Sequence, residues 1–443
     1  LQAVAANAPA YAYHQVDRYE RTALLIGEGV HNPAYALDVF RVHGGSRHDY
    51  RVHGPDLSCR AAGITFGDEL PGTLAGPAIP LGRLWDDPAL EEADRTRSFG
   101  SYAGSGDSFL YGMQQAPPPP RPWQVYWGDG EGLAVHVVPS DNVQAYLAWG
   151  DVPRRPGNPA RFRYLILRRE GAAPLSSTFA TVLEPLAGGS VIRAVDRLDT
   201  GKEGQLALRI MHSGGSDVVL AAEPGIPLAV AGMLLAGRLA VLRFDKAGAV
   251  HAAYLCGQTL RAPGVTLETQ GQLRGVISGI ERAGQQLDIT LAGPVRVTEA
   301  LTAQLAGTVC SIAGNHQQAL VRSAVRIGER TVRLFLDRGA PVGQLVVEAV
   351  AGTTVTTRTT LYPPFRGRDD IGRHLEGAWL QAAGVTRRVC SVRMRPPQGH
   401  TLELDAALDC PPGTPATLLA WEHGAEIRLE PAVWWSGVGA TPG

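Results

Sequence analysis

Short apolar runs separated by turn residues constrain the fold of this chain more than any other feature of its sequence. Runs such as Thr22–Ile26 and Tyr35–Val42 have the length of strands, and turn-forming glycines follow them closely. The segment Val332–Asp337 places apolar and polar residues on different faces, as a half-buried strand does. Amphipathic helical patterns are scarce, with short candidates only at Pro88–Arg95 and Asp369–Ala382. The pattern therefore predicts an all-β protein.

The composition fits a folded protein with many turns and excludes two classes of partner. Of 443 residues, 44% are hydrophobic and 19% are charged, and 53 glycines and 32 prolines supply turn positions. A formal net charge of −1 gives no electrostatic basis for binding nucleic acid. No apolar stretch reaches the roughly 18 residues that a membrane helix needs, so no membrane partner is expected.

The basic residues are almost all arginines, since only Lys202 and Lys246 among the 41 are lysines. A GC-rich genome explains this excess, and so does binding of planar carboxylates and sulfates by guanidinium groups. Both explanations stay open. The five cysteines lie far apart without a CxxC motif, which excludes zinc ribbons and thioredoxin-like sites, although a bridge between Cys390 and Cys410 is conceivable. Neither a cofactor nor a metal is predicted.

Gradual changes in composition along the chain suggest where its domains begin and end. Aromatic residues become rare after about residue 262, and a further change occurs near residue 351. We therefore expect a large β domain over 1–262, a β-rich continuation over 263–350 and a small β domain over 351–443. No internal repeat of fixed period is evident.

The densest group of polar and aromatic residues lies in Tyr35–Gly54, where an apolar strand and a Gly44–Gly45 turn precede a second strand. The period of two along that second strand puts one set of side chains on one face and another set on the opposite face. The first set is Arg47, Asp49, Arg51 and His53, and the second set is His48, Tyr50 and Val52. The first set suits a polyanion, although a polar sheet face is usually only solvated. The second set is either a general acid–base pair or packed in the core.

Other candidates have equally plausible structural roles. Trp123, Tyr126 and Trp127 form a platform for sugar stacking or fill the core, and the Trp434–Trp435 pair has the same two interpretations. The segment Ser176–Thr178 lacks a GxSxG elbow, which excludes a serine hydrolase of that type. Gly104–Gly106 neither follows a strand nor begins a helix, which excludes a nucleotide-binding loop.

Four strings in order resemble the heparinase II/III-like polysaccharide lyases downstream of their active-site histidine segment. These strings are HQVDRYERTALLI (14–26), YALDVFRVHGGSRHDYRVHG (35–54), PWQVYWGD (122–129) and LSSTFATVLEP (175–185). The match covers residues 10–260 best.

The resemblance implies a large antiparallel β-sandwich, followed by a smaller β region and preceded in the full protein by an α/α domain missing here. Such lyases cleave uronate polysaccharides by β-elimination: one group neutralises the carboxylate, a base removes the C5 proton and an acid protonates the leaving oxygen. The resemblance also implies a secreted or periplasmic protein whose partners are an acidic polysaccharide and its own helical domain. The family's metal site would lie before Leu1.

From the motifs we expect two groups of site residues. The expected catalytic residues are His48, Tyr50 and His53. The expected substrate-binding residues are Arg41, Arg47, Arg51, Trp123 and Trp127. Because the helical domain's catalytic groups are missing, we expect the isolated chain to be inactive. A non-catalytic carbohydrate-binding or adhesion module and a purely structural sandwich are the alternatives.

Overall fold

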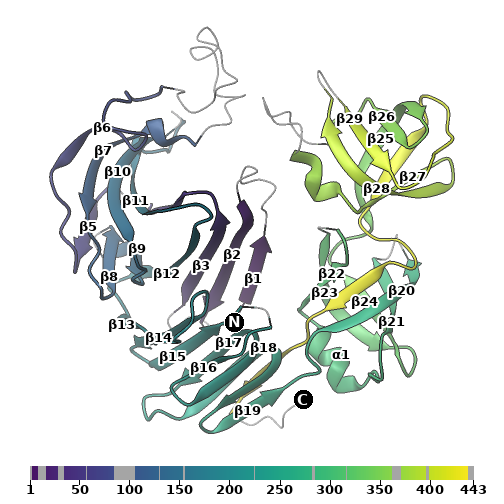
Figure 1. Cartoon of the computed structure of the whole chain (residues 1–443). Coiled ribbons are helices and arrows are strands. Elements are labelled where there is room, and N and C mark those ends of the chain that lie inside the picture. The colour runs from purple at the N-terminus through teal and green to yellow at the C-terminus, as the bar shows by residue number, and fades with distance from the viewer. Residues whose placement is uncertain are drawn as a thin grey trace. The chain divides into compact units, whose positions relative to one another are not determined.

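The computed structural model describes residues 2–7, 16–27, 34–55, 57–83, 105–128, 130–152, 155–223, 225–281, 285–315, 317–361, 371–395 and 399–437. Strands dominate these residues and pair in antiparallel sheets, so the predicted all-β class is confirmed (Figure 1). The chain divides into two compact units, 1–219 with 243–249 and 220–242 with 250–443. No helix among the described residues is long and apolar enough to cross a membrane.

Two sheets of the first unit contain the segments that resemble the lyases. The seven-stranded sheet runs β1 (Gln2–Asn7), β2 (Val16–Ile26), β3 (Tyr35–Gly44), β12 (Ser176–Ala187), β9 (Glu131–Val137), β8 (Trp123–Trp127) and β5 (Cys59–Ala62). The five-stranded sheet runs β4 (Arg47–His53), β11 (Arg161–Glu170), β10 (Val143–Asp151), β7 (Leu110–Ala116) and β6 (Glu69–Thr73). The short 3-10 helix η3 (Asp107–Phe109) precedes β7.

These two sheets pack face to face around one apolar core, which makes them a β-sandwich. The seven-stranded sheet contributes residues such as Phe40, Trp127 and Phe179, and the five-stranded sheet contributes residues such as Tyr50 and Leu165. The burial of β8 alternates strictly, because one face of the strand meets this core and the other does not. The large antiparallel sandwich expected from the sequence is therefore present.

A third, eight-stranded sheet follows. Its main path is β13 (Ile192–Arg197), β14 (Leu206–His212), β15 (Gly215–Ala221), β17 (Met233–Phe244), β18 (Val250–Ala262) and β19 (Val265–Glu268). β16 (Leu228–Val230) pairs with β17, and β32 (Ala432–Ser436) pairs with β18.

The rest of the second unit forms two small closed barrels, which Figure 1 shows in green to yellow. The first consists of β20 (Leu273–Glu281), β21 (Gln286–Leu291), β24 (Thr331–Leu336), β23 (Gln318–Arg326), β22 (Val309–Ile312) and β31 (Glu426–Leu429). The second consists of β25 (Pro341–Ala351), β26 (Thr354–Thr357), β29 (His400–Leu404), β28 (Val385–Met394), β27 (Trp379–Ala382) and β30 (Pro415–Leu419). The smaller C-terminal β region is thus a pair of barrels.

The two barrels are duplicates, and the second is inserted into the first. Counted along the chain within each barrel, both follow the order first, second, fifth, fourth, third, sixth, and the first barrel's last strand comes after the whole second barrel. The helix α1 (Glu299–Leu305) and the 3-10 helix η4 (Ile371–Leu375) occupy the same place, between the second and third strands. The fourth and fifth strands carry a bulge at equivalent points, after Val321 and after Val389.

Side chains and glycines support this duplication. Asp337 and Asp405 both follow the fifth strand, and the Oδ1 of each accepts a backbone N–H from 17 residues upstream at 2.9 Å. The segments LAGTVCSIAG (305–314) and LEGAWLQAAG (375–384) align, with Gly307 and Gly377 at φ of 78° and 81°. The sequence shows no repeat of fixed period, and the duplication has none, because one barrel is inserted into the other.

Some expectations from the sequence change. The chain enters the second barrel at Pro341, and β25 runs across the boundary expected near residue 350. All five cysteines are free, including the exposed Cys390 and the buried Cys410, so the conceivable bridge between these two does not form. Of the two helix candidates, 88–95 lies outside the described residues, and 369–382 contains η4 and strand β27.

Candidate functional site

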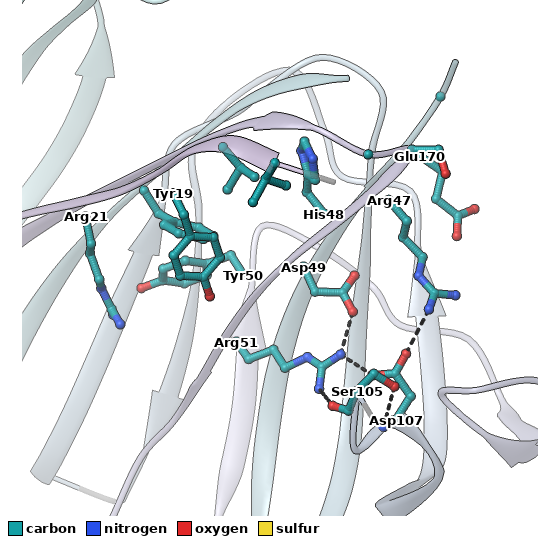
Figure 2. A pocket seen from close by; sticks show the side chains of 16 residues that line it. Tyr19, Arg21, Arg47, His48, Asp49, Tyr50, Arg51, Ser105, Asp107 and Glu170 are labelled. Carbon is teal, nitrogen blue, oxygen red and sulfur yellow. Dashed lines mark hydrogen bonds and ion pairs between the residues drawn. The ribbon is translucent and has the colours of Figure 1, made fainter. Parts of the chain in front are cut away.

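A cavity of about 910 Å³ lies beside β4, the edge strand of the five-stranded sheet. Because β4 pairs only with β11, side chains from both of its faces reach the cavity wall. Strands β2 and β3 and the segment at Ser105–Asp107 complete the wall. Figure 2 shows the aromatic and cationic side chains that line it.

One face of β4 presents the polar set that the sequence predicted, and it meets two further residues. The Nη2 of Arg47 donates to Asp107 Oδ2 at 3.3 Å, and the Nη2 of Arg51 donates to Asp49 Oδ2 at 2.7 Å and also to Asp107. Arg168 of β11 binds Asp49 through Nε and Nη2, both at 2.7 Å, and reaches Asp107 at 3.3 Å. Three guanidinium groups thus surround two carboxylates (Figure 2 shows all but Arg168).

This cluster is largely buried, which makes its charges interact strongly. The Asp107 side chain is 0% exposed and that of Arg168 is 8% exposed, whereas that of Arg47 is 36% exposed. Burial alone would raise the pKa of Asp49, but the hydrogen bonds and charges of Arg168 and Arg51 outweigh burial and lower it. The cluster contains three guanidinium groups and two carboxylates, and Arg47 is the most exposed of these three arginines.

The other face of β4 places Tyr50 in a buried network. Its hydroxyl lies 2.9 Å from Asp38 Oδ2, to which it donates, and 2.8 Å from Thr181 Oγ1. Arg21 of β2 binds the same Asp38 carboxylate from the cavity side, with Nε at 2.9 and 3.0 Å from its two oxygens. Burial, and then the Asp38 charge, raise the pKa of Tyr50 well above its usual value. The phenol therefore holds its proton, and Asp38 is its acceptor.

His48 lies on the same face as Tyr50 and has both ring nitrogens in use. The Ser177 hydroxyl donates to Nδ1 at 2.8 Å, and the Nε2–H donates to the Gly44 carbonyl at 2.5 Å. His48 is 5% exposed, and burial lowers the pKa of its imidazole, which favours the neutral ring. This geometry fixes the turn before β4. A catalytic role for His48 or Tyr50 stays a prediction, because each would first have to leave its present hydrogen bonds.

His53 lies at the end of β4, and the described lining of the cavity does not include it. Its Nδ1–H donates to the Gly54 carbonyl at 3.1 Å. The ring stacks on Phe162 at 4.4 Å between centroids and meets Tyr164 edge-on at 4.9 Å. The structure therefore does not bring His53 together with the other two predicted catalytic residues in this cavity, although its Nε2 makes no hydrogen bond with a described residue.

Three of the predicted substrate-binding residues lie in the protein interior, which corrects the sequence-based expectation. Trp123 and Trp127 are 1% and 0% exposed and pack in the sandwich core, so neither ring offers a face to a sugar. Trp127 Nε1 donates to the Arg163 carbonyl at 2.9 Å. Arg41 is 4% exposed and lies 3.5 Å from Glu20, on a strand whose cavity-lining residues are Phe40 and Val42. Arg47 and Arg51 do line the cavity.

The sequence analysis missed several side chains of this site, among them Tyr19, Arg21, Asp107, Arg168 and Glu170. Tyr19 is 41% exposed at the cavity and packs edge-on against Phe40, with the ring centroids 4.9 Å apart. A signal existed for Tyr19 and Arg21, since both belong to the lyase-like string 14–26. Asp107 and Arg168 have no local signal, because they lie 60 and 119 residues from their partners Arg47 and Asp49.

No cluster of three or more metal-ligating side chains occurs among the described residues. The cavity lining combines the guanidinium groups of the arginines, the exposed phenol ring of Tyr19 and the exposed carboxylate of Glu170. Guanidinium groups bind anions, and an exposed aromatic ring binds sugar surfaces.

Comparisons with known proteins do not assign this chain to a family. No protein-family model matches the sequence, and no curated protein matches it significantly.

Proposed function

We propose that this chain is the β-sheet portion of a secreted or periplasmic polysaccharide lyase, which cleaves an acidic polysaccharide by β-elimination at the uronate. The observation that carries the proposal is the arginine-lined cavity on the free edge of β4, built from the strings that resemble the lyases. In this proposal the cavity is the wall that holds the substrate.

Arg47 is the residue best placed to bind the uronate carboxylate. Among the described residues its side chain bonds only to Asp107, at 3.3 Å, and more than a third of the side chain is exposed, so most of its N–H donors are available. In β-elimination a cation near the carboxylate stabilises the enolate-like intermediate that follows loss of the C5 proton. Arg51 is less available, because Asp49, Asp107 and the Ser105 carbonyl already accept from it.

Tyr19 adds a surface for the sugar ring. Its exposed ring lies beside Arg21 and lines the same cavity as Arg47 (Figure 2), and aromatic faces pack on the C–H surfaces of pyranoses. The proton-transfer groups are proposed to come from the α/α domain of the full-length protein together with β4, as the resemblance implies.

The alternative is a non-catalytic carbohydrate-binding or adhesion module. One observation favours it: both nitrogens of His48 and the proton of Tyr50 are committed to buried hydrogen bonds. In that case the same cavity holds glycan without cleaving it.

The test measures binding and cleavage by the same chain. Uronate polysaccharides are titrated calorimetrically, and the ultraviolet absorbance of the unsaturated uronate product is followed in parallel. We expect Arg47→Gln to weaken binding about fivefold. The control is Arg322→Gln, an exposed arginine on β23 that removes the same charge and should have no effect.

The outcomes separate the two functions. Product formation would place the chemistry within this chain, whereas binding without product requires the assay to be repeated with the full-length protein. If the full-length protein also binds without cleaving, the module is the better description. If Arg47→Gln and Tyr19→Ala both bind as tightly as wild type, the cavity beside β4 is not the glycan site.

A further inference from the structure

A second cavity of the first unit, of about 810 Å³, is lined by cations that have no ionic partner among the described residues. It lies between β13, the hairpin of β14 and β15, and the turn after β17. Arg193, Arg209 and Lys246 line it, and all three are exposed. None of them makes an ion pair or side-chain hydrogen bond with a described residue.

Only one carboxylate lines this cavity among the described residues, and it is engaged elsewhere. Asp245 Oδ1 accepts the backbone N–H groups of Ala247 and Ala249 at 2.8 and 2.9 Å. The aspartate thus stabilises the turn that presents Lys246. Three cations therefore face a single carboxylate that already has two donors.

The scaffold beneath the cavity is held in place. At Gly215 φ is 144°, and an added Cβ would lie 2.1 Å from the Phe244 carbonyl oxygen. Only glycine therefore allows the hairpin to lie this close to the end of β17. Under the hairpin, Asp217 accepts from Tyr35 at 2.6 Å and from Arg243 at 3.0 Å. A fixed scaffold lowers the entropic cost of binding a ligand.

We propose that this cavity binds the carboxylate or sulfate groups of an acidic polysaccharide at a point separate from the cavity beside β4. The choice of polymer rests on the proposed function, whereas the excess of free cations does not. Ser213 and Ser216 offer hydroxyls to a glycan, and Met211 and Phe244 offer apolar surface to its C–H faces. The balanced charge of the whole chain argues against nucleic acid as the ligand.

The test compares matched variants by calorimetry at several salt concentrations. The probes are heparin and hyaluronan oligosaccharides, which separate sulfate from carboxylate, and a single-stranded oligonucleotide of equal charge. We expect each of Arg193→Gln, Arg209→Gln and Lys246→Gln to weaken glycan binding about threefold, and the triple variant at least tenfold. The dependence of log K on log salt should become shallower by up to about one for each cation removed.

Arg47→Gln and Arg322→Gln are the controls, with Arg47→Gln reporting on the cavity beside β4. Loss of binding in the triple variant, with an unchanged melting temperature, supports the second site even if Arg47→Gln has no effect and the proposed function fails. Wild-type affinity and salt dependence in the triple variant would overturn the site. Equal affinity for the oligonucleotide would show a surface for any polyanion and overturn the assignment to glycan.

Discussion

Replacing Asp107 with asparagine tests whether the charge cluster beside β4 stabilises the first unit. The Asp107 carboxylate is completely buried and accepts from Arg47, Arg51 and Arg168. Asparagine preserves its size but not its charge. The variant would leave three guanidinium groups around one remaining carboxylate, that of Asp49.

The loss of stability expected for Asp107→Asn depends on how many ion pairs the three arginines keep. Removing one partner of a buried ion pair costs about 3–5 kcal/mol. Here the loss should be smaller, because the side chains of Arg47 and Arg51 are 36% and 28% exposed. Asp49 also keeps both of its 2.7 Å bonds to Arg168. We therefore expect a loss of about 2–3 kcal/mol, which lowers the melting temperature by roughly 4–10 °C in a unit of this size.

Differential scanning calorimetry measures this loss as a shift of the transition assigned to the first unit. The control is Asp288→Asn in the first barrel, where Asp288 and Arg333 also form two bonds, at 2.6 and 2.9 Å. That pair is more open to solvent, so little change is expected. Equal shifts in the two variants, or a loss below about 1 kcal/mol for Asp107→Asn, would refute the argument that burial decides the cost.

Two further predictions concern the barrels. Because the two barrels place these carboxylates at equivalent positions, Asp337→Ala and Asp405→Ala should each lower the free energy of unfolding, measured in urea, by about 1 kcal/mol. Each substitution removes the same kind of bond to a backbone N–H. Clearly unequal losses would argue against this equivalence. His400 is 0% exposed and its Nε2 accepts from Leu361 N at 2.9 Å, while burial, and then the nearby His374, lower its pKa from 6.5 to about 4. The unfolded chain therefore binds a proton at this histidine more tightly, and the free energy of unfolding should fall as the pH drops from about 6.5 towards 4, by at most about 3 kcal/mol. His400→Gln should flatten this pH dependence in urea titrations, and an unchanged profile would contradict it.

The all-β class followed from the sequence because alternation is a local property. The strand Arg47–His53 shows this, since a period of two alone separates Arg47, Asp49 and Arg51 from His48 and Tyr50, and the structure places them on those faces. The helix Glu299–Leu305 escaped prediction because seven residues are too few to show a helical period. Its cap, Thr298 accepting from Leu301 N at 3.1 Å, was the available signal.

The duplication was hidden for a different reason. Inserting the second barrel before the last strand of the first breaks the repeat into unequal pieces, so no fixed period exists along the chain. The equivalent residues that remain are mostly turn positions, such as Gly314 and Gly384 at φ of 75° and 78°. A positive φ requires glycine at such positions, so these glycines stay the same in both barrels. Many core side chains, in contrast, can be exchanged for others of suitable volume.

The site was only partly predictable, since its electrostatics depend on distant segments. Arg47 and Arg51 look like free cations in the sequence, and only the fold shows that Asp107 compensates them. Trp123 and Trp127 were ambiguous because the same W-x-V-x-W alternation suits a core face and an exposed aromatic platform. The deciding information was the second sheet that covers that face.

The two cavities of the first unit differ in a way that predicts a division of roles. Beside β4 the arginines are already held by Asp49 and Asp107, so their guanidinium groups are fixed in position and bring little unscreened charge. In the second cavity Arg193, Arg209 and Lys246 form no ion pair with any described residue, so they bring charge without a fixed geometry. Preorganised donors orient a ligand, whereas free surface cations attract it in a salt-dependent way. High salt should therefore abolish the contribution of the second cavity first, and the binding that remains should depend on Arg47.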